Sequence, residues 1–177
     1  MFRFKNRFST VLLIGAVSLS AILTSCGDGT QNAVTDESTS AGTTAPITEI
    51  TPEQQALIDD VSIFLDDMYN KFNSKDFSAY VEYWHIDESE KATMLQNLTS
   101  SSETFDTQYK VTSVFAQNTE DRKVSVSAIT ESTSTNISSN FKTLLKETHY
   151  FILSQENGTY YITNYAAGET EIINSGE

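Results

Sequence analysis

The sequence has one cysteine, Cys26, and only two histidines. A single thiol cannot form an intramolecular disulfide, and one cysteine with two histidines falls short of the four ligands of a structural zinc site. The seven glycines form no Gly-rich phosphate-binding loop, and the serines form no G-x-S-x-G motif. We therefore expect neither a metal nor a cofactor.

Basic residues are also scarce, since 11 Lys and Arg stand against 24 Asp and Glu, a net charge of −13 at pH 7. Three of the basic residues lie in the first ten positions, so 8 basic and 24 acidic side chains follow residue 25, a net charge of −16. Nucleic acids and anionic surfaces attract basic clusters, and none occurs in this part of the chain. Nucleic acid is therefore excluded as a partner.

The N-terminal segment has the pattern of an export signal. A basic stretch over residues 1–10 is followed by thirteen uncharged residues, Val11 to Leu23. This apolar run has secretory length and is shorter than the about 20 residues of a membrane span. The pattern predicts export from the cytoplasm.

The residues Leu23-Thr24-Ser25-Cys26 come directly at the end of this run and resemble the lipobox of bacterial lipoproteins. In that family the cysteine thiol receives a diacylglyceryl group and the signal peptide is cleaved before it. The resemblance implies a signal peptide over residues 1–25 and lipid attachment, palmitate included, at Cys26. It also implies anchoring to the extracytoplasmic face of the cell membrane. The alternative is an ordinary signal peptide in which the cysteine has no role.

The chain after Cys26 divides into a linker and a domain. Residues 26–50 are rich in Thr, Ser and Gly, contain no aromatic residue and show no helical or strand period, which predicts a flexible linker. Such a linker spans about 25 to 30 Å. Residues 51–177 are long enough for a core of their own.

The domain begins with a predicted helix over residues 51–72. Thr51 suits the N-cap, Pro52 the first helical position, and Gln54 a capping box. One apolar stripe follows the helical period: Leu57, Val61, Phe64, Leu65, Met68 and Phe72.

Two shorter helices are predicted next. Residues 77–84 contain Phe77, Tyr80, Val81 and Trp84 at helical spacing. Asp87 is the expected N-cap of a third helix through residue 98, whose inward-facing residues would be Met94, Leu95 and Leu98.

After residue 103 the hydrophobic period changes to two, which predicts strands. Two strands are indicated by alternation at Tyr109, Val111, Ser113 and Phe115, and at Val124, Val126, Ala128 and Thr130. Asn157-Gly158 suits a two-residue type I′ turn joining the last two strands.

This turn fixes a predicted register, with Leu153 opposite Ile162, Phe151 opposite Asn164 and His149 opposite Ala166. The face expected to lie under the helices comprises Glu147, His149, Phe151, Leu153, Tyr160, Ile162 and Asn164. The other face carries Tyr150, Ile152, Tyr161, Thr163 and Tyr165, and we interpret it as an exposed or contact surface.

These elements predict an α+β fold in which N-terminal helices pack on a curved four-stranded antiparallel sheet. The stretch "FLDDMYNKFNSKDFSAYVEYW" and the final strand "NGTYYITNY" resemble the NTF2-like (cystatin-like cone) superfamily. The resemblance implies a pocket between the helices and the concave face of the sheet. Some members are isomerases, cyclases or dehydratases that place an Asp or Glu, often with His or Tyr, in this pocket.

The candidate catalytic residues are few. His149 and Glu147 share a predicted face, so an imidazole–carboxylate pair could act as a general base, and Asp87 is a further candidate. The alternative is that His149 and Glu147 lie solvated at the rim of the sheet.

The candidate ligand-binding residues are Trp84, His85, Tyr160 and Asn164. The run Tyr83 to Asp87 could stack a ligand on Trp84, although a buried tryptophan beside a helix cap explains the same residues and is the interpretation we prefer.

The favoured hypothesis is an extracytoplasmic lipoprotein that displays a small, non-catalytic binding domain. Its partner would be an envelope component or a small apolar ligand, and we also consider a homodimer. The alternative is a pocket enzyme of the ketosteroid isomerase or dehydratase type that uses His149 with Glu147, or Asp87.

Overall fold

The computed structural model describes residues 50–119 and 122–176. The predicted signal peptide, Cys26 and the linker up to residue 49 lie outside these residues. Ile50–Glu177 form one compact unit with its own hydrophobic core, so this unit can fold without the residues that precede it.

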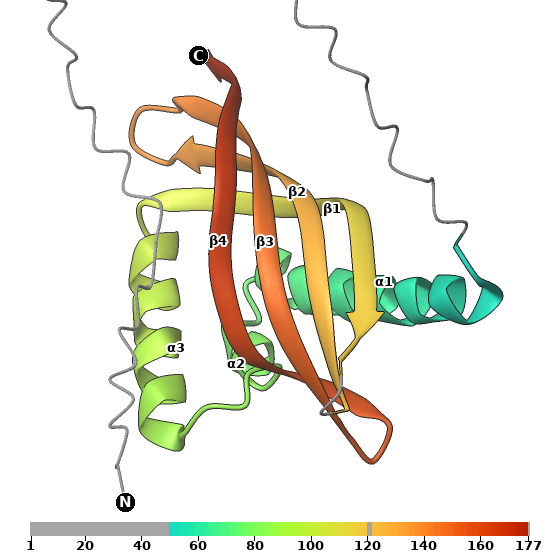
Figure 1. Ribbon diagram of the computed structural model, residues 1–177. Helices are drawn as coiled ribbons and strands as arrows, with labels where there is room; N and C mark the ends of the chain where they lie inside the picture. Colours follow the sequence, from blue (N-terminus) through green and yellow to red (C-terminus); the bar gives the residue numbers. More distant parts are fainter. Residues whose placement is uncertain (1–49, 120–121, 177) are drawn as a thin grey trace, which may run out of the picture. The chain divides into compact units, whose positions relative to one another are not determined.

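Three helices precede four strands, and the strands form one antiparallel sheet in the order β1-β2-β3-β4 (Figure 1). This architecture confirms the predicted α+β fold. The bounds are α1 Pro52–Asn73, α2 Phe77–Val81, α3 Glu88–Ser102, β1 Phe105–Asn118, β2 Lys123–Asn136, β3 Lys142–Glu156 and β4 Thr159–Gly176.

Helix α1 is hydrogen-bonded to β1 near both of its ends. The Thr51 hydroxyl caps the helix by accepting from the Gln54 backbone N–H (3.2 Å). The predicted capping box is wrong, because the Gln54 side chain donates to the Ala116 carbonyl of β1. At the other end, the Asn73 side chain donates to the Tyr109 carbonyl and accepts from the Tyr109 N–H, both at 2.8 Å. These bonds satisfy backbone groups of β1.

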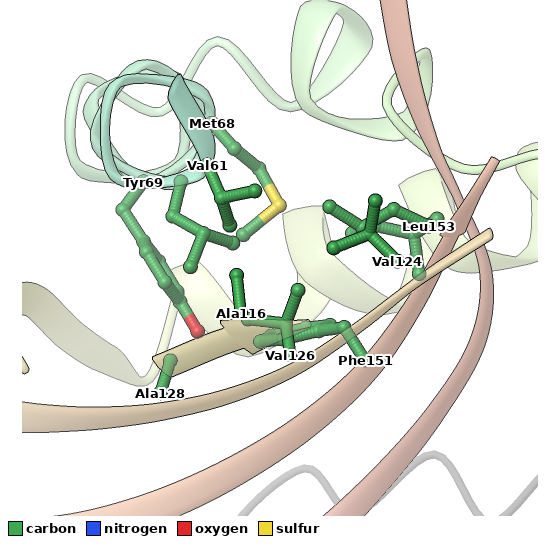
Figure 2. Packing of buried hydrophobic residues seen from close by; sticks show 11 residues of the cluster. Val61, Met68, Tyr69, Ala116, Val124, Val126, Ala128, Phe151 and Leu153 are labelled. Atoms are coloured by element: carbon green, nitrogen blue, oxygen red, sulfur yellow. The ribbon is translucent and has the colours of Figure 1, made fainter. Parts of the chain in front are cut away.

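The core lies between α1 and the inner, concave face of the sheet (Figure 2). Val61, Leu65 and Met68 from the predicted stripe are fully buried, and Tyr69 joins them. Their partners on the sheet are Ala116, Val124, Val126, Ala128, Phe151, Leu153 and Ile162.

The two shorter helices differ from the prediction. Helix α2 ends at Val81, and Trp84 forms a parallel bridge to Ile162 of β4. The Ile162 N–H donates to the Tyr83 carbonyl (2.8 Å), and the Ile162 carbonyl accepts from the His85 N–H (2.9 Å). Because of this pairing, residues 83–85 are not helical and cover part of the edge of β4. Asp87 caps α3 through a capping box, as the N-cap prediction required. No residue of α3 is fully buried, and Met94, Leu95 and Leu98 are only half-buried.

A β-bulge in β1 overturns the predicted alternation. Val111 pairs with Thr130 and Ser113 with Ile129, so Thr112 is an extra residue. An extra residue exchanges the two faces of the strand beyond it. Ala116 therefore points into the core, and Phe115 is 52% exposed on the opposite face.

A second bulge changes the register of the last hairpin. Asn157 and Gly158 both have positive φ (51° and 83°), which confirms the type I′ turn, and Leu153 pairs with Ile162 as predicted. Beyond that pair Thr163 is an extra residue.

The consequence is that Phe151 pairs with Tyr165, and His149 with Ala167. The predicted pairs of Phe151 with Asn164 and of His149 with Ala166 are wrong, because the bulge moves both of these pairs by one residue. Tyr165 consequently packs on the inner face, and Asn164 is exposed.

Within the described residues, no helix combines the length and apolar character needed to cross a membrane.

Candidate functional site

Polar side chains interrupt the inner face of the sheet beside the core. Thr130 and Ser132 of β2 are 0% and 2% exposed, and His149 of β3 is 7% exposed. Cross-strand pairing places Thr130 opposite Glu147 and Ala128 opposite His149, so these side chains share one face of two adjacent strands. Burying polar groups is costly unless they are hydrogen-bonded, so their partners decide what this cluster can do.

Both ring nitrogens of His149 are hydrogen-bonded to the protein. Nε2 lies 2.9 Å from the Thr130 hydroxyl, and Nδ1 lies 3.0 Å from the Tyr165 hydroxyl. A neutral imidazole donates from one nitrogen and accepts at the other, and each hydroxyl can take either role. The three side chains therefore form a connected chain from β2 to β4.

Glu147 lies next to these three side chains and has a hydrogen-bond partner of its own. Its Oε2 accepts a hydrogen bond from the Ser132 hydroxyl at 2.6 Å. Burial lowers the pKa of His149, and the negative charge of Glu147 opposes this effect without reversing it. The imidazole is therefore neutral at pH 7.

Aromatic rings enclose the imidazole. Phe151 and Tyr165 stack on it, with ring centroids 6.1 and 5.9 Å away, and Tyr69 and Tyr109 approach within 6.4 Å. Burial, with Glu147 nearby, raises the pKa of each of these three tyrosines, so their hydroxyls stay protonated.

Trp84 packs edge-on against Tyr165, one of these aromatic residues, with ring centroids 5.9 Å apart. Its buried indole N–H has no hydrogen-bond partner among the described residues. Of the predicted ligand-binding residues, Trp84 thus packs against the ring of Tyr165, which binds His149.

The other predicted residues lie elsewhere. His85 is exposed, with Nδ1 3.4 Å from Glu156 Oε1. Asp87 is exposed as the N-cap of α3, and hydrogen bonds from the Ser89 hydroxyl and the Glu90 N–H lower its pKa. Neither residue is among the groups that surround His149.

Tyr160 and Asn164 differ from the prediction as well. Tyr160 packs edge-on against Phe64 of α1 at 5.7 Å, and burial raises its pKa. Asn164 is exposed, and its side chain accepts from the Tyr165 N–H at 2.9 Å. The second bulge places the Tyr165 side chain on the inner face of the sheet and Asn164 on the opposite face, the reverse of the prediction.

Sequence reasoning brought His149 and Glu147 together but missed the residues that bind them. Thr130 was predicted only as part of a strand, Ser132 and Tyr69 were not considered, and Tyr165 was predicted on the opposite face of the sheet. The only signal for these partners in the sequence was Thr130, a polar residue that follows the apolar residues Val124, Val126 and Ala128 at the same two-residue spacing.

Within residues 50–119 and 122–176, no three His, Cys, Asp or Glu side chains gather closely enough to hold a metal ion.

Comparison with known proteins gives matches in structure only. No family model matches the sequence, and no curated protein matches it either.

Several solved structures share the fold. A scytalone dehydratase-like protein from Novosphingobium aromaticivorans aligns with a TM-score of 0.57 at 6% identity, over 71% of this chain and 91% of its own. ActVI-ORFA from Streptomyces coelicolor aligns at 0.53 and 9% identity, over 67% and 96%. A ketosteroid isomerase-like protein from Erwinia carotovora atroseptica aligns at 0.50 and 22% identity, over 70% and 99%. With helices packed on a four-stranded antiparallel sheet, the described domain has the NTF2-like cone fold of these structural neighbours.

Proposed function

We propose that this chain is a lipoprotein anchored through Cys26 to the extracytoplasmic face of the cell membrane. Its NTF2-like domain would bind an envelope component or a small apolar ligand without catalysing a reaction. Support for the anchor comes from the basic segment, the apolar run and the lipobox-like residues that end at Cys26. Two or three acyl chains, at about 0.8 kcal/mol per buried CH₂, would hold the protein on the bilayer.

The observation that favours binding over catalysis is the hydrogen bonding of His149. A general base needs a free lone pair within about 3 Å of the proton that it removes. Both nitrogens of His149 already face protein hydroxyls, and the Glu147 carboxylate accepts from Ser132. Accepting a substrate proton at His149 would require one of these buried bonds to break. The His149 cluster is therefore better suited to a structural role in a binding domain than to catalysis.

The binding role is tested by native mass spectrometry of the membrane-anchored protein, purified gently from the envelope of the producing cells. We expect a reproducible excess mass that is lost on denaturation, or co-purification with one envelope protein. The variant His149→Gln, which keeps a hydrogen-bonding side chain, should retain the same occupant or partner. A domain that carries neither would contradict the proposal.

The second candidate is an isomerase or dehydratase that uses His149 with Glu147. It is favoured by the neutral, buried imidazole beside a carboxylate, and by the ketosteroid isomerase-like and scytalone dehydratase-like proteins among the structural neighbours. If the wild-type domain converts its bound compound and His149→Gln stops this conversion, the second candidate replaces the first.

The anchor makes a separate prediction. In Cys26→Ser the thiol that would carry the lipid is absent, so the exported protein should leave the membrane fraction and appear in the soluble extracytoplasmic fraction. The conservative variant Ser25→Ala keeps the thiol and should remain membrane-bound. Cell fractionation with a high-salt wash measures the difference, and a Cys26→Ser protein that stays on the membrane after this wash would refute lipid anchoring.

A further inference from the structure

The loop between β2 and β3 presents apolar side chains at one end of the sheet. Ile137 is 48% and Phe141 is 46% exposed in this loop, and Phe105 at the start of β1 is 37% exposed. The Ile137 N–H donates to the Thr104 carbonyl (2.9 Å), so the start of β1 lies beside the loop. Figure 1 shows the loop at the end of the β2–β3 hairpin, opposite the turn between β3 and β4. We call Phe105, Ile137 and Phe141 the hairpin tip.

Hydrogen bonds within the loop fix its conformation. The Asn136 N–H donates to the Phe141 carbonyl at 2.9 Å. The Asn136 side-chain oxygen accepts from the N–H groups of Ser138 and Ser139, at 3.0 and 3.1 Å. A surface that is ordered before it binds loses less conformational entropy on binding than a flexible one. The loop therefore presents Ile137 and Phe141 in an arrangement that binding does not have to create.

The hairpin tip carries no excess of negative charge, although the chain is acidic. Residues 132–146 contain no Asp or Glu, whereas the whole chain has 24, and they include Lys142. Two carboxylates, those of Glu103 and Asp106, lie near the start of β1. Lys75 Nζ lies 3.2 Å from Asp106 Oδ1 and balances its charge, which leaves Glu103 against Lys142. An anionic surface is therefore not repelled at this end of the domain.

The surface of helix α1 has the opposite character. Its exposed residues include four aspartates: Asp59, Asp60, Asp66 and Asp67. These carboxylates oppose an approach to the anionic headgroups of a lipid surface. A domain that is held close to a bilayer therefore approaches it more readily through the hairpin tip than through α1.

A lipid bilayer is the partner that suits the hairpin tip. The tip is apolar and lies at the end of a hairpin, and the bilayer interface takes up apolar side chains without a groove of matching shape. The predicted linker after Cys26 spans about 25 to 30 Å. A domain tethered by this linker has an effective concentration at the bilayer on the order of millimolar, so even the weak binding of a few apolar side chains is sufficient.

We propose that the hairpin tip docks the domain on the phospholipid surface of the membrane that carries the Cys26 anchor. Ile137 and Phe141 enter the boundary between headgroups and acyl chains, and the Lys142 ammonium group faces the lipid phosphates. This inference rests on the proposed anchor, which keeps the domain near the bilayer. It does not involve the His149 cluster.

Fluorescence of the tethered protein on vesicles tests the insertion. Residues 26–177 contain one thiol, that of Cys26, which can be coupled to a maleimide lipid in vesicles of phosphatidylethanolamine and phosphatidylglycerol. Phe141→Trp emission should shift to shorter wavelength on these vesicles and be quenched by brominated acyl chains. Ile63→Trp, at an exposed (69%) position of α1, is the matched control and should show neither effect. The wild type, whose only tryptophan is Trp84, gives the background.

Partitioning of the untethered domain Ile50–Glu177 onto the same vesicles gives a second measurement. Phe141→Ser should lower the partition coefficient about 5-fold, the loss expected when a half-exposed phenylalanine no longer leaves water. Phe115→Ser is the matched control, because Phe115 is similarly exposed (52%) but lies on the outer face of the sheet. It should leave the partition coefficient unchanged. Both positions are exposed, so both variants should fold with a wild-type circular dichroism spectrum.

The proposal is overturned if brominated lipids leave the Phe141→Trp emission unchanged or quench both tryptophan variants equally. It is also overturned if Phe141→Ser partitions like the wild type. If Phe141→Ser instead loses an envelope protein that the wild type retains, the hairpin tip is a protein-docking surface. Failure of the anchor is seen separately, in a Cys26→Ser protein that stays on the membrane, because the vesicle experiment supplies the tether chemically.

Discussion

Leu65→Ala is expected to lower the free energy of unfolding of the domain by about 3 to 5 kcal/mol, as measured by urea denaturation. Leu65 is fully buried on α1 and belongs to the cluster that contains Phe151 and Leu153 of the sheet. Removing its side chain loses apolar burial and leaves a cavity, the combination that gives buried Leu→Ala changes their large cost. Domains of this kind have a total stability of about 5 to 15 kcal/mol, so this loss is a large fraction of the whole.

Ile63→Ala is the matched control for this change. Ile63 lies two residues away on the same helix but is 69% exposed. Alanine also has the higher helix propensity, so the stability should change by less than about 0.5 kcal/mol. Equal losses at both positions would contradict the observed orientation of α1.

Stability is expected to fall as the pH drops from about 7.5 to about 5.5, because of His149. Burial holds the pKa of His149 below its ordinary value of 6.5 in the folded protein, whereas the unfolded chain regains that value. Below about pH 6.5 the unfolded state consequently binds more protons than the folded state. The folded state then loses at most about 1.4 kcal/mol per pH unit until the folded pKa is reached.

His149→Gln should remove this slope, and the exposed His85→Gln should keep it. Both variants are unfolded in urea at several pH values across the same range. The His149 variant should also be less stable at pH 7.5, since glutamine cannot satisfy the buried hydroxyls of both Thr130 and Tyr165 in the geometry of the imidazole. The same slope in wild type and His149→Gln would show that His149 is not the group that titrates.

Much of the fold could be predicted because its signals are local. The helical stripe through Val61, Leu65 and Met68, the cap at Thr51 and the Asn157-Gly158 turn each depend on residues close together in the sequence. The pairing of Leu153 with Ile162 followed from the turn alone, since a two-residue loop fixes the first few pairs.

The wrong predictions concern residues whose side-chain face depends on how one strand pairs with the next. A period-two pattern assumes that every residue has a partner, and the extra residues Thr112 and Thr163 break this assumption. The bulge at Thr112 turned Phe115 outward, and the bulge at Thr163 turned Tyr165 inward. The candidate site was affected most, because Tyr165 supplies one of the two hydrogen bonds to His149.

By itself, the sequence determined the helical and strand segments and their order, the acidic charge and the scarcity of metal ligands, because these follow from composition and from periods read over a few residues. The lipobox-like residues at Cys26 also belong to the sequence alone, and the anchor that they predict remains to be tested. Only the tertiary structure decided which face each residue occupies beyond a bulge, where α2 ends against β4, and which hydroxyls bind His149. Those features depend on pairing between segments that are distant in the chain, and no local pattern encodes that pairing.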